Sequence, residues 1–169
     1  DDTAKAGVQT LEDQMSTVVS ALAATEAGPF AHSMLVRPKQ YLVELAAILP
    51  LLGYRALRPA KAGEAPREVP SGVYFDLATW HLINTVYNPA RVAELRAMRG
   101  FYADARQHER LMTVVEERLG HELAARAEDA KIAVAEGGHT TIDLSHVERG
   151  LAVELSEAQA VAALDADIA

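Results

Sequence analysis

Histidine and carboxylate pairs are the residues of this chain whose types are best suited to acid–base chemistry. Asp104 and His108 are four residues apart, and so are Glu117 and His121, a spacing that would place each pair on one helix face. A carboxylate in that position would hold the imidazole as a general base requires. Nucleophilic catalysis would also need a hydroxyl beside the histidine, and no Ser or Thr has a spacing that implies one. We therefore expect solvated surface contacts here, with a small hydrolase as an alternative.

The six histidines do not form a recognisable metal-binding pattern. His108 and His121 would lie on well-separated faces of a helix, because each residue turns an α-helix by about 100°. His139 and His146 flank an expected strand at an odd spacing, which would point them to opposite sides of it. The chain has no cysteine, which excludes thiolate ligands, thiolate nucleophiles and disulfides. We expect no metal site.

The charge and hydropathy of the chain limit its partners and its location. Its 24 acidic and 16 basic residues give a net charge of −8, which argues against nucleic acid because phosphate binding depends on Lys and Arg. The longest apolar stretch, residues 45–52, is too short to cross a membrane. The absence of cysteine fits a reducing compartment, so we expect a cytoplasmic protein. Half of the 169 residues are apolar, enough for the core of a single domain over residues 1–169.

The first part of the chain is expected to be helical, with one long loop. Apolar residues at helical spacing predict a helix over about 10–26, and a nearly all-apolar run predicts a buried helix over 40–52. Pro50 should kink or end that second helix, and Gly53 should stop it. Residues 58–72 are rich in Pro, Gly and charged side chains, which indicates an irregular loop.

Further helices are expected after this loop. A helix over about 76–87 is followed by Asn88 and Pro89, a pair typical of the cap and first position of another helix. Apolar residues three and four apart then predict one long helix over about 104–136. The glycine pair at 137–138 should stop it.

The last part of the chain predicts a small hairpin and a final helix. Polar and apolar residues alternate over 141–145, and a second strand is expected over 151–155. Ser156 and Gln159 have the spacing of a capping box, which predicts the start of a helix. The sequence therefore predicts a mostly helical α+β fold, in which a long helix packs on a small antiparallel sheet between flanking helices.

Several motifs in this chain resemble one protein family. The run Arg126-Ala-Glu-Asp-Ala-Lys-Ile-Ala-Val, then Gly137-Gly138 and Thr140-Thr-Ile-Asp-Leu, is similar to the helix-to-strand passage in upper lobe II of the seventy-kilodalton heat-shock chaperone ATPases. Upstream, Pro70-Ser-Gly-Val-Tyr-Phe with Trp80, and Val92-Ala-Glu-Leu-Arg, look closer still to the shorter bacterial chaperone-like relatives. The resemblance covers roughly residues 45–169.

The resemblance implies a nucleotide-binding role for three positions. In the family a glutamate and a lysine of this helix flank the adenine and ribose of ATP, which would place Glu128 and Lys131 at the edge of a nucleotide cleft. Ala135 stands where the family normally has a serine, so one hydrogen-bonding contact is missing. By spacing alone, Glu128 and Lys131 would form an ordinary solvated ion pair. The resemblance implies no cofactor for the isolated chain, and ATP or ADP with Mg²⁺ for an intact parent protein.

The resemblance also implies that the chain is not an enzyme. Phosphoryl transfer in such an ATPase needs glycine-rich phosphate turns and Mg²⁺-binding aspartates, and the sequence lacks these motifs. We therefore expect a non-catalytic subdomain, separated from the rest of its ATPase, that contributes one side of an adenine-nucleotide cleft and a surface for other subdomains or a protein partner. Residues 41–169 follow the family pattern, whereas residues 1–40 are foreign to it. An engineered or accessory protein-binding module built on this subdomain stays as an alternative.

Overall fold

A computed structural model describes the backbone of residues 44–168. The burial of side chains is described for residues 46–162. The helix predicted over residues 10–26 lies outside the described residues, and so does the start of the helix predicted over 40–52.

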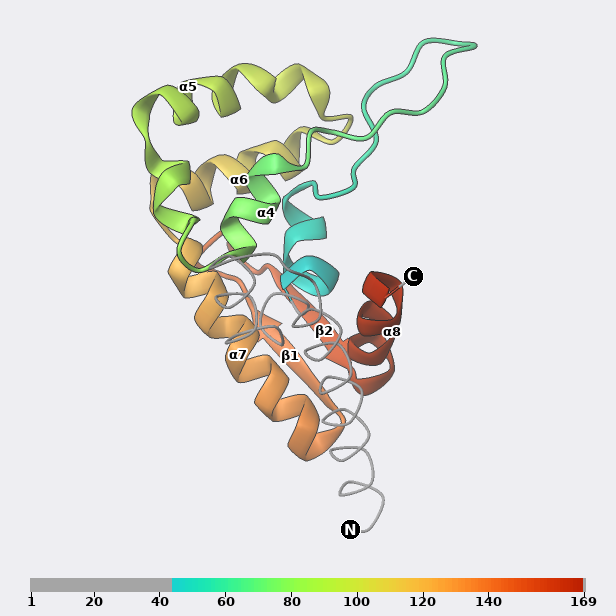
Figure 1. Cartoon of the computed structure of the whole chain (residues 1–169), viewed down its shortest axis with the longest axis vertical. Helices are drawn as coiled ribbons and strands as arrows, with labels where there is room; N and C mark the ends of the chain where they lie inside the picture. The colour runs from blue at the N-terminus through green and yellow to red at the C-terminus, as the bar shows by residue number, and fades with distance from the viewer. Residues whose placement is uncertain (1–43, 169) are drawn as a thin grey trace, which may run out of the picture.

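The described residues form a mostly helical α+β fold around a small antiparallel sheet (Figure 1). β1 (His139–Asp143) pairs with β2 (Ala152–Ser156), and Thr141 lies opposite Glu154 in the register. α7 (Gly120–Gly137) lies alongside this hairpin and contacts β1. The fold class expected from the sequence is confirmed, and the predicted hairpin is present with its strands shifted slightly along the chain.

The apolar run that opens the described part forms two short helical segments rather than one regular helix. η1 (Glu44–Ile48) is a π-helical turn, and η2 (Leu49–Leu52) is a 3₁₀ helix. Pro50 has no N–H with which to continue an α-helical ladder, and the change from π-helical to 3₁₀ geometry falls between Ile48 and Leu49, just before it. Gly53 ends the segment with a φ of 101°, and a Cβ there would lie 2.5 Å from a ring carbon of Tyr102. Backbone conformation and packing therefore both require glycine at this stop.

The helix predicted over residues 76–87 is wrong in its start and in its continuity. α4 spans Gly72–Ala78, and a separate 3₁₀ helix, η3, spans Ile83–Tyr87. Thr79 follows α4 in an extended conformation, and its hydroxyl donates to the carbonyl oxygen of Phe75 at 2.7 Å. A threonine that bonds to the preceding turn competes with the helical ladder, which accounts for the break.

α5 (Pro89–Ala97) begins where the Asn-Pro pair predicts it. The side-chain oxygen of Asn88 accepts a hydrogen bond from the N–H of Ala90 at 3.0 Å. Pro89 occupies the first helical position, where an N–H would have no partner within the helix. The predicted cap is confirmed, and the short 3₁₀ helix η4 (Met98–Phe101) follows α5.

The single long helix predicted over residues 104–136 is wrong, because two helices occupy this range. α6 spans Ala105–Glu116, and α7 begins at Gly120. Between them Arg118 has a φ of 55°, and the N–H of Leu119 donates to the carbonyl of Val114 at 2.9 Å, which closes the end of α6. Helices that end in this way usually have glycine in the left-handed position. An arginine at that position hides the break from sequence analysis.

The end of α7 and the start of the last helix agree with their local signals. Gly138 caps α7 with a φ of 78°, as the glycine pair predicts. Ser156 and Gln159 form the predicted capping box, in which the N–H of Ser156 donates to the side-chain oxygen of Gln159 at 2.9 Å. α8 (Glu157–Ile168) follows directly after β2.

A hydrophobic core joins η1 and η2 to the helices and the hairpin. The core contains a buried chain of hydrogen bonds: the Tyr74 hydroxyl donates to the carbonyl of Leu52 at 2.8 Å and lies 2.7 Å from the hydroxyl of Tyr102. Burial raises the pKa of the Tyr74 hydroxyl, so the group stays neutral. The largest fully buried side chains are Tyr74, Ile48, Leu49, Leu52, Leu77, Ile83, Leu111, Leu123, Leu144, Leu155 and Val86.

Residues 58–71 form the irregular loop that their composition predicts. An isolated antiparallel bridge between Leu57 and Glu68 holds the base of the loop together. Its two hydrogen bonds run from the N–H of Arg58 to the carbonyl of Arg67 and from the N–H of Val69 to the carbonyl of Ala56. Figure 1 shows this loop projecting from the body at the end opposite to the Gly137 end of α7. Among the helices of the described residues, none has the length and apolar character needed to cross a membrane.

Candidate functional site

Glu128 and Lys131 form an ion pair on the surface of α7, as their spacing predicts. The Lys131 ammonium lies 2.5 Å from a carboxylate oxygen of Glu128, and the side chains of Lys131 and Glu128 are 26% and 40% exposed. The structure therefore brings two of the three predicted site residues together within reach of solvent. A ligand that engaged either group would compete with this pair.

The same face of α7 carries an apolar residue that the sequence analysis did not single out. Ile132 is 47% exposed and lies one helical turn after Glu128, and the partly buried Ala135 lies one turn after Lys131. One signal was available in the sequence, because Ile132 falls outside the apolar stripe that α7 turns to the core. The buried residues of α7 are Gly120, Leu123, Ala124, Ala127, Ala130 and Val134.

This face, defined here as Glu128, Lys131, Ile132 and Ala135, combines charged groups with an aliphatic surface. A nucleoside has flat apolar faces and polar edges, and sites for such ligands pair apolar contact area with a few placed polar groups. Ile132 and Ala135 offer aliphatic contacts, Lys131 offers hydrogen-bond donors and Glu128 offers acceptors. Ala135 contributes no side-chain hydrogen bond, so the polar contacts would come from the ion pair alone.

A second ion pair on α7 provides an internal comparison. Arg126 contacts Glu122 at 3.1 Å, and the two side chains are 37% and 48% exposed. These two residues are four apart on α7, in the helical turns before Glu128 and Lys131. Exposed pairs of this kind contribute a few tenths of a kcal/mol to stability. An ion pair is therefore not by itself a binding site, and the neighbouring Ile132 distinguishes the later pair.

The Asp104–His108 pair considered for catalysis does not form. The Asp104 carboxylate caps α6 and accepts a hydrogen bond from the N–H of Arg106 at 3.0 Å. The His108 side chain is buried, and its Nε2 donates to the carbonyl oxygen of Leu95 at 2.8 Å. The imidazole therefore has a structural role and no access to a substrate.

The Glu117–His121 pair fails for a different reason. Glu117 caps the end of α6, whereas His121 belongs to α7, so the residues do not share a helix face. The rings of His121 and Trp80 pack edge to face, with their centroids 4.6 Å apart. Of the other expected candidates, His139 is exposed at the start of β1, and His146 follows the hairpin's first strand. Within residues 44–168, no group of three His, Asp or Glu side chains is arranged to hold a metal ion.

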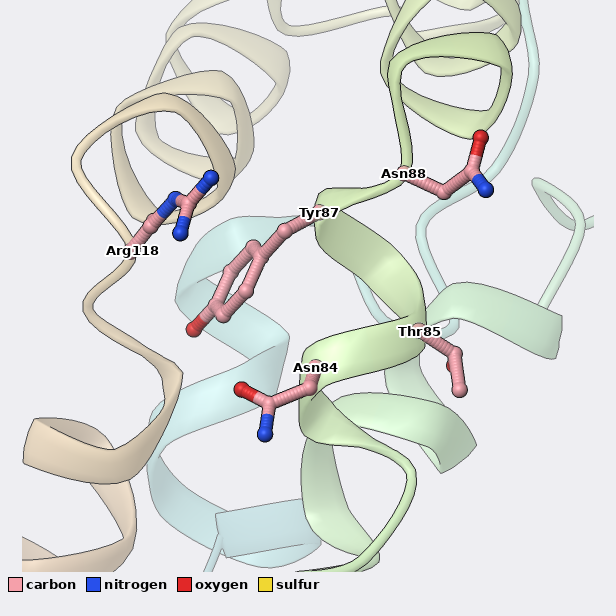
Figure 2. A pocket seen from close by; sticks show the side chains of 5 residues that line it. All are labelled: Asn84, Thr85, Tyr87, Asn88 and Arg118. Atoms are coloured by element: carbon pink, nitrogen blue, oxygen red, sulfur yellow. The ribbon is translucent and has the colours of Figure 1, made fainter.

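An open polar pocket of about 580 Å³ lies between η3 and the junction of α6 and α7 (Figure 2). Arg118 and Asn84 flank the ring of Tyr87, whose hydroxyl accepts a hydrogen bond from the N–H of Gly120 at 2.9 Å. Asn88 and Thr85 complete the lining, but both side chains are already engaged. Asn88 caps α5, and the Thr85 hydroxyl donates to the carbonyl oxygen of Leu82. Burial raises the pKa of the Tyr87 hydroxyl. The lining has no carboxylate or imidazole, so it offers no acid–base chemistry.

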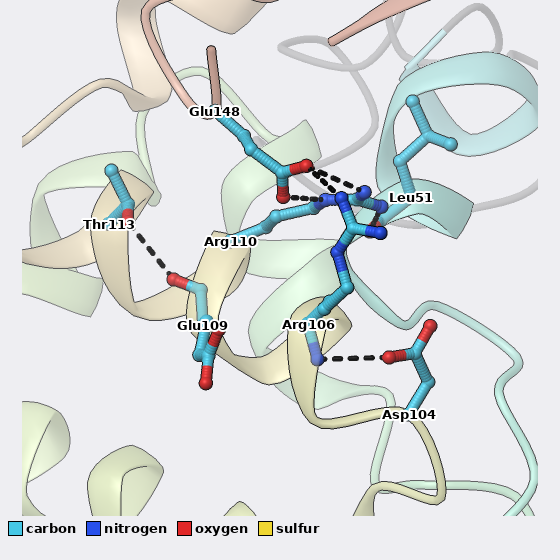
Figure 3. Close-up of polar contacts among 7 residues, drawn as sticks. All are labelled: Leu51, Asp104, Arg106, Glu109, Arg110, Thr113 and Glu148. Atoms are coloured by element: carbon cyan, nitrogen blue, oxygen red, sulfur yellow. Dashed lines mark hydrogen bonds and ion pairs between the residues drawn. The ribbon is translucent and has the colours of Figure 1, made fainter. Parts of the chain in front are cut away.

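A polar cluster joins α6 to two other elements (Figure 3). Arg110 contacts Glu148 at 2.6 Å and donates to the carbonyl of Leu51 at 3.2 Å, and Arg106 also pairs with Glu148. The two guanidiniums, Arg110 first, lower the pKa of Glu148 to about 2, and Glu148 raises the pKa of Arg110. This carboxylate stays ionised and fully engaged, so the cluster ties α6 to η2 and to the hairpin turn. Sequence analysis missed it because the partners are far apart in the chain.

Comparison with known proteins identifies no family for this chain: no family model, curated protein or solved structure matches it. The geometry of α7 and the motifs quoted above are therefore the basis for assigning a function.

Proposed function

We propose that this chain is a non-catalytic subdomain of a heat-shock-chaperone-like ATPase and that the Glu128–Lys131 face of α7 forms one side of an adenine-nucleotide cleft. One observation carries the proposal: an ion pair and an exposed Ile132 lie together on a helix that leads through Gly138 into a strand. The order of helix, glycine pair and strand supports the resemblance to the upper lobe II subdomain.

Each member of this face has a specific role in the proposal. Lys131 and Glu128 separate from one another and bond to the ribose hydroxyls and the polar edge of the base. Ile132 and Ala135 contact the flat face of the adenine. Other subdomains of the parent ATPase, or a protein partner, supply the opposite wall and the groups that bind phosphate and Mg²⁺. Binding by this chain alone is weak, because one wall cannot bury the 70–90% of ligand surface typical of a complete pocket.

The proposal includes the absence of ATP hydrolysis. Catalysis of phosphoryl transfer depends on positioned phosphate- and Mg²⁺-binding groups, and the glycine pair here follows a helix instead of preceding one. We expect no phosphate release from ATP above background. A Mg²⁺-dependent rate that survives repurification would contradict the subdomain assignment.

The composition supports a location for this function. The chain has no cysteine, as is common for proteins of reducing compartments, and its net charge of −8 disfavours nucleic acid as a partner. We therefore place the proposed subdomain in the cytoplasm, with a nucleotide and other protein surfaces as its partners.

The test is a nuclear magnetic resonance titration with adenosine and with ATP at millimolar concentration. Amide shifts should centre on residues 128–135 and should be similar for both ligands, because only the nucleoside contacts the chain. The variant Glu128→Gln/Lys131→Met should lose most of this response. The matched variant Glu122→Gln/Arg126→Met, which removes the other ion pair of α7, should keep it.

Two outcomes would overturn the nucleotide assignment. One is a response that both variants weaken equally, because the face would then have no special role. The other is no response at α7 for either ligand at millimolar concentration. Sub-micromolar affinity would show instead that the chain holds a far more complete pocket than one wall.

A further inference from the structure

The unpaired cations of the described chain gather on one projecting loop. Residues 44–168 contain 13 Lys and Arg residues, and seven of these form ion pairs with described carboxylates. Four of the remaining six lie within residues 55–67, which we name the basic arm. The four are Arg55, Arg58, Lys61 and Arg67.

The basic arm is an island of positive charge on an acidic protein. Its four cations and the single carboxylate of Glu64 give it a net charge of +3, against −8 for the whole chain. Figure 1 shows that the arm projects away from the body. Arg55, Lys61 and Arg67 are exposed, and Arg58 is partly buried at the base. The positive charge of the arm attracts an acidic ligand, whereas the acidic body of the protein repels it.

Two of the guanidinium groups are held in place by aromatic rings. The Arg58 guanidinium lies 4.0 Å from the centroid of the Phe101 ring, and that of Arg55 lies 5.6 Å from the centroid of Tyr54. Stacking on a ring face restrains the side chain and leaves the N–H donors at the edge of the guanidinium available. Those donors match a carboxylate in a two-point hydrogen bond.

The backbone of the arm adds a second feature. Arg55 has a φ of 60°, in the left-handed region. A residue with a Cβ atom is strained in this conformation, whereas glycine is not. Leu57, two residues later, is 53% exposed. Between the two sides of the arm lies a hollow of about 180 Å³, whose charged lining residues are Arg58, Arg67 and Glu64. Cations, an exposed leucine and a hollow therefore lie on the same short segment.

We propose that the basic arm is a docking surface for an acidic peptide segment of a partner protein. Carboxylates of the segment pair with Arg58, Lys61 and Arg67, and an apolar side chain of the segment covers Leu57. Nucleic acid fits less well, because a continuous chain of phosphates would extend from the arm over the acidic body. This surface is independent of the α7 face and would remain if the nucleotide proposal failed.

The experiment measures binding of a fluorescently labelled oligo-glutamate peptide containing one leucine, by anisotropy, with the full chain at low and at physiological salt. We expect saturable binding that weakens as salt rises. Lys61→Glu/Arg67→Glu should weaken it about tenfold or more, because attraction becomes repulsion at the docking surface. Arg118→Glu/Arg149→Glu changes the net charge by the same amount at exposed positions outside the arm and should change affinity less than about twofold.

A second pair of variants separates docking from loss of folding. Lys61→Ala/Arg67→Ala removes the charges without reversing them and should give a smaller loss of affinity at an unchanged melting temperature. Arg58→Lys keeps the charge but loses the flat guanidinium over Phe101, and should weaken binding several-fold. Equal losses in the arm and control variants, or no saturable binding at low salt, would overturn the proposal. Tighter, arm-dependent binding of a single-stranded oligonucleotide of equal charge would overturn it in favour of nucleic acid.

Discussion

The close packing around Gly120 leads to a sharp prediction about stability. Gly120 is buried at the start of α7, and a Cβ atom there would lie 2.5 Å from Cγ2 of Ile83 and 2.7 Å from the hydroxyl oxygen of Tyr87. Its N–H also donates to that hydroxyl at 2.9 Å. Ile83 is fully buried, so it has little room to move away. Gly120→Ala should therefore destabilise the fold.

The magnitude follows from opposing effects. Overpacking a well-packed core costs about 1–3 kcal/mol, and loss of the Tyr87 hydrogen bond adds about 1 kcal/mol. Alanine recovers up to about 1 kcal/mol through its higher helix propensity. We therefore expect a net loss of about 1–3 kcal/mol. For a domain of this size, each kcal/mol lowers the melting temperature by about 2–4 °C.

Urea and thermal melts followed by circular dichroism would measure the loss. Gly137→Ala is the matched control, because Gly137 is also in α7 but a Cβ there would have nothing within 4 Å. That variant should be neutral or slightly stabilised by its helix propensity. If Gly120→Ala is as stable as Gly137→Ala, the contact between η3 and the start of α7 is not as tight as the structure indicates, and the reasoning is refuted.

Two further predictions concern the brace at Glu148 and the segment before Glu44. Glu148 has a pKa lowered from 4.5 to about 2, so its contribution to stability is complete above pH 4.5 and is lost as the pH falls towards 2. Glu148→Gln should lower the free energy of unfolding at neutral pH and weaken its decrease between pH 4.5 and pH 2. Glu109→Gln removes an exposed ion pair with Arg99 and should leave that acid-dependent decrease unchanged. Leu22 lies outside the described residues, and Leu22→Ala tests whether the apolar face predicted over residues 10–26 is buried. A decrease of about 2–5 kcal/mol in the free energy of unfolding, measured by a urea melt, would support burial. An unchanged free energy of unfolding would exclude it.

Short-range signals in the sequence determined where several elements begin and end. The Asn88 cap, the Ser156–Gln159 capping box and the stops at Gly53 and Gly138 were all predicted correctly. Each has a signal in hydrogen bonds or backbone conformation within about four residues, so the residues that reveal it are close together in the sequence. The pairing of Glu128 with Lys131 follows the same rule, because helical spacing alone brings the two side chains together.

Only the tertiary structure decided how these elements are divided and what they expose. The helix break has an arginine, Arg118, in the left-handed position where glycine is usual. The start of α7 at Gly120 packs closely against Ile83, a residue far away in the sequence. The brace between Arg110 and Glu148 joins residues that no local spacing relates. The exposure of Ile132 depends on which stripe of α7 meets the core. Long-range packing chooses among local alternatives of similar free energy, so the candidate ion pair was predictable whereas the helix break and the brace were not.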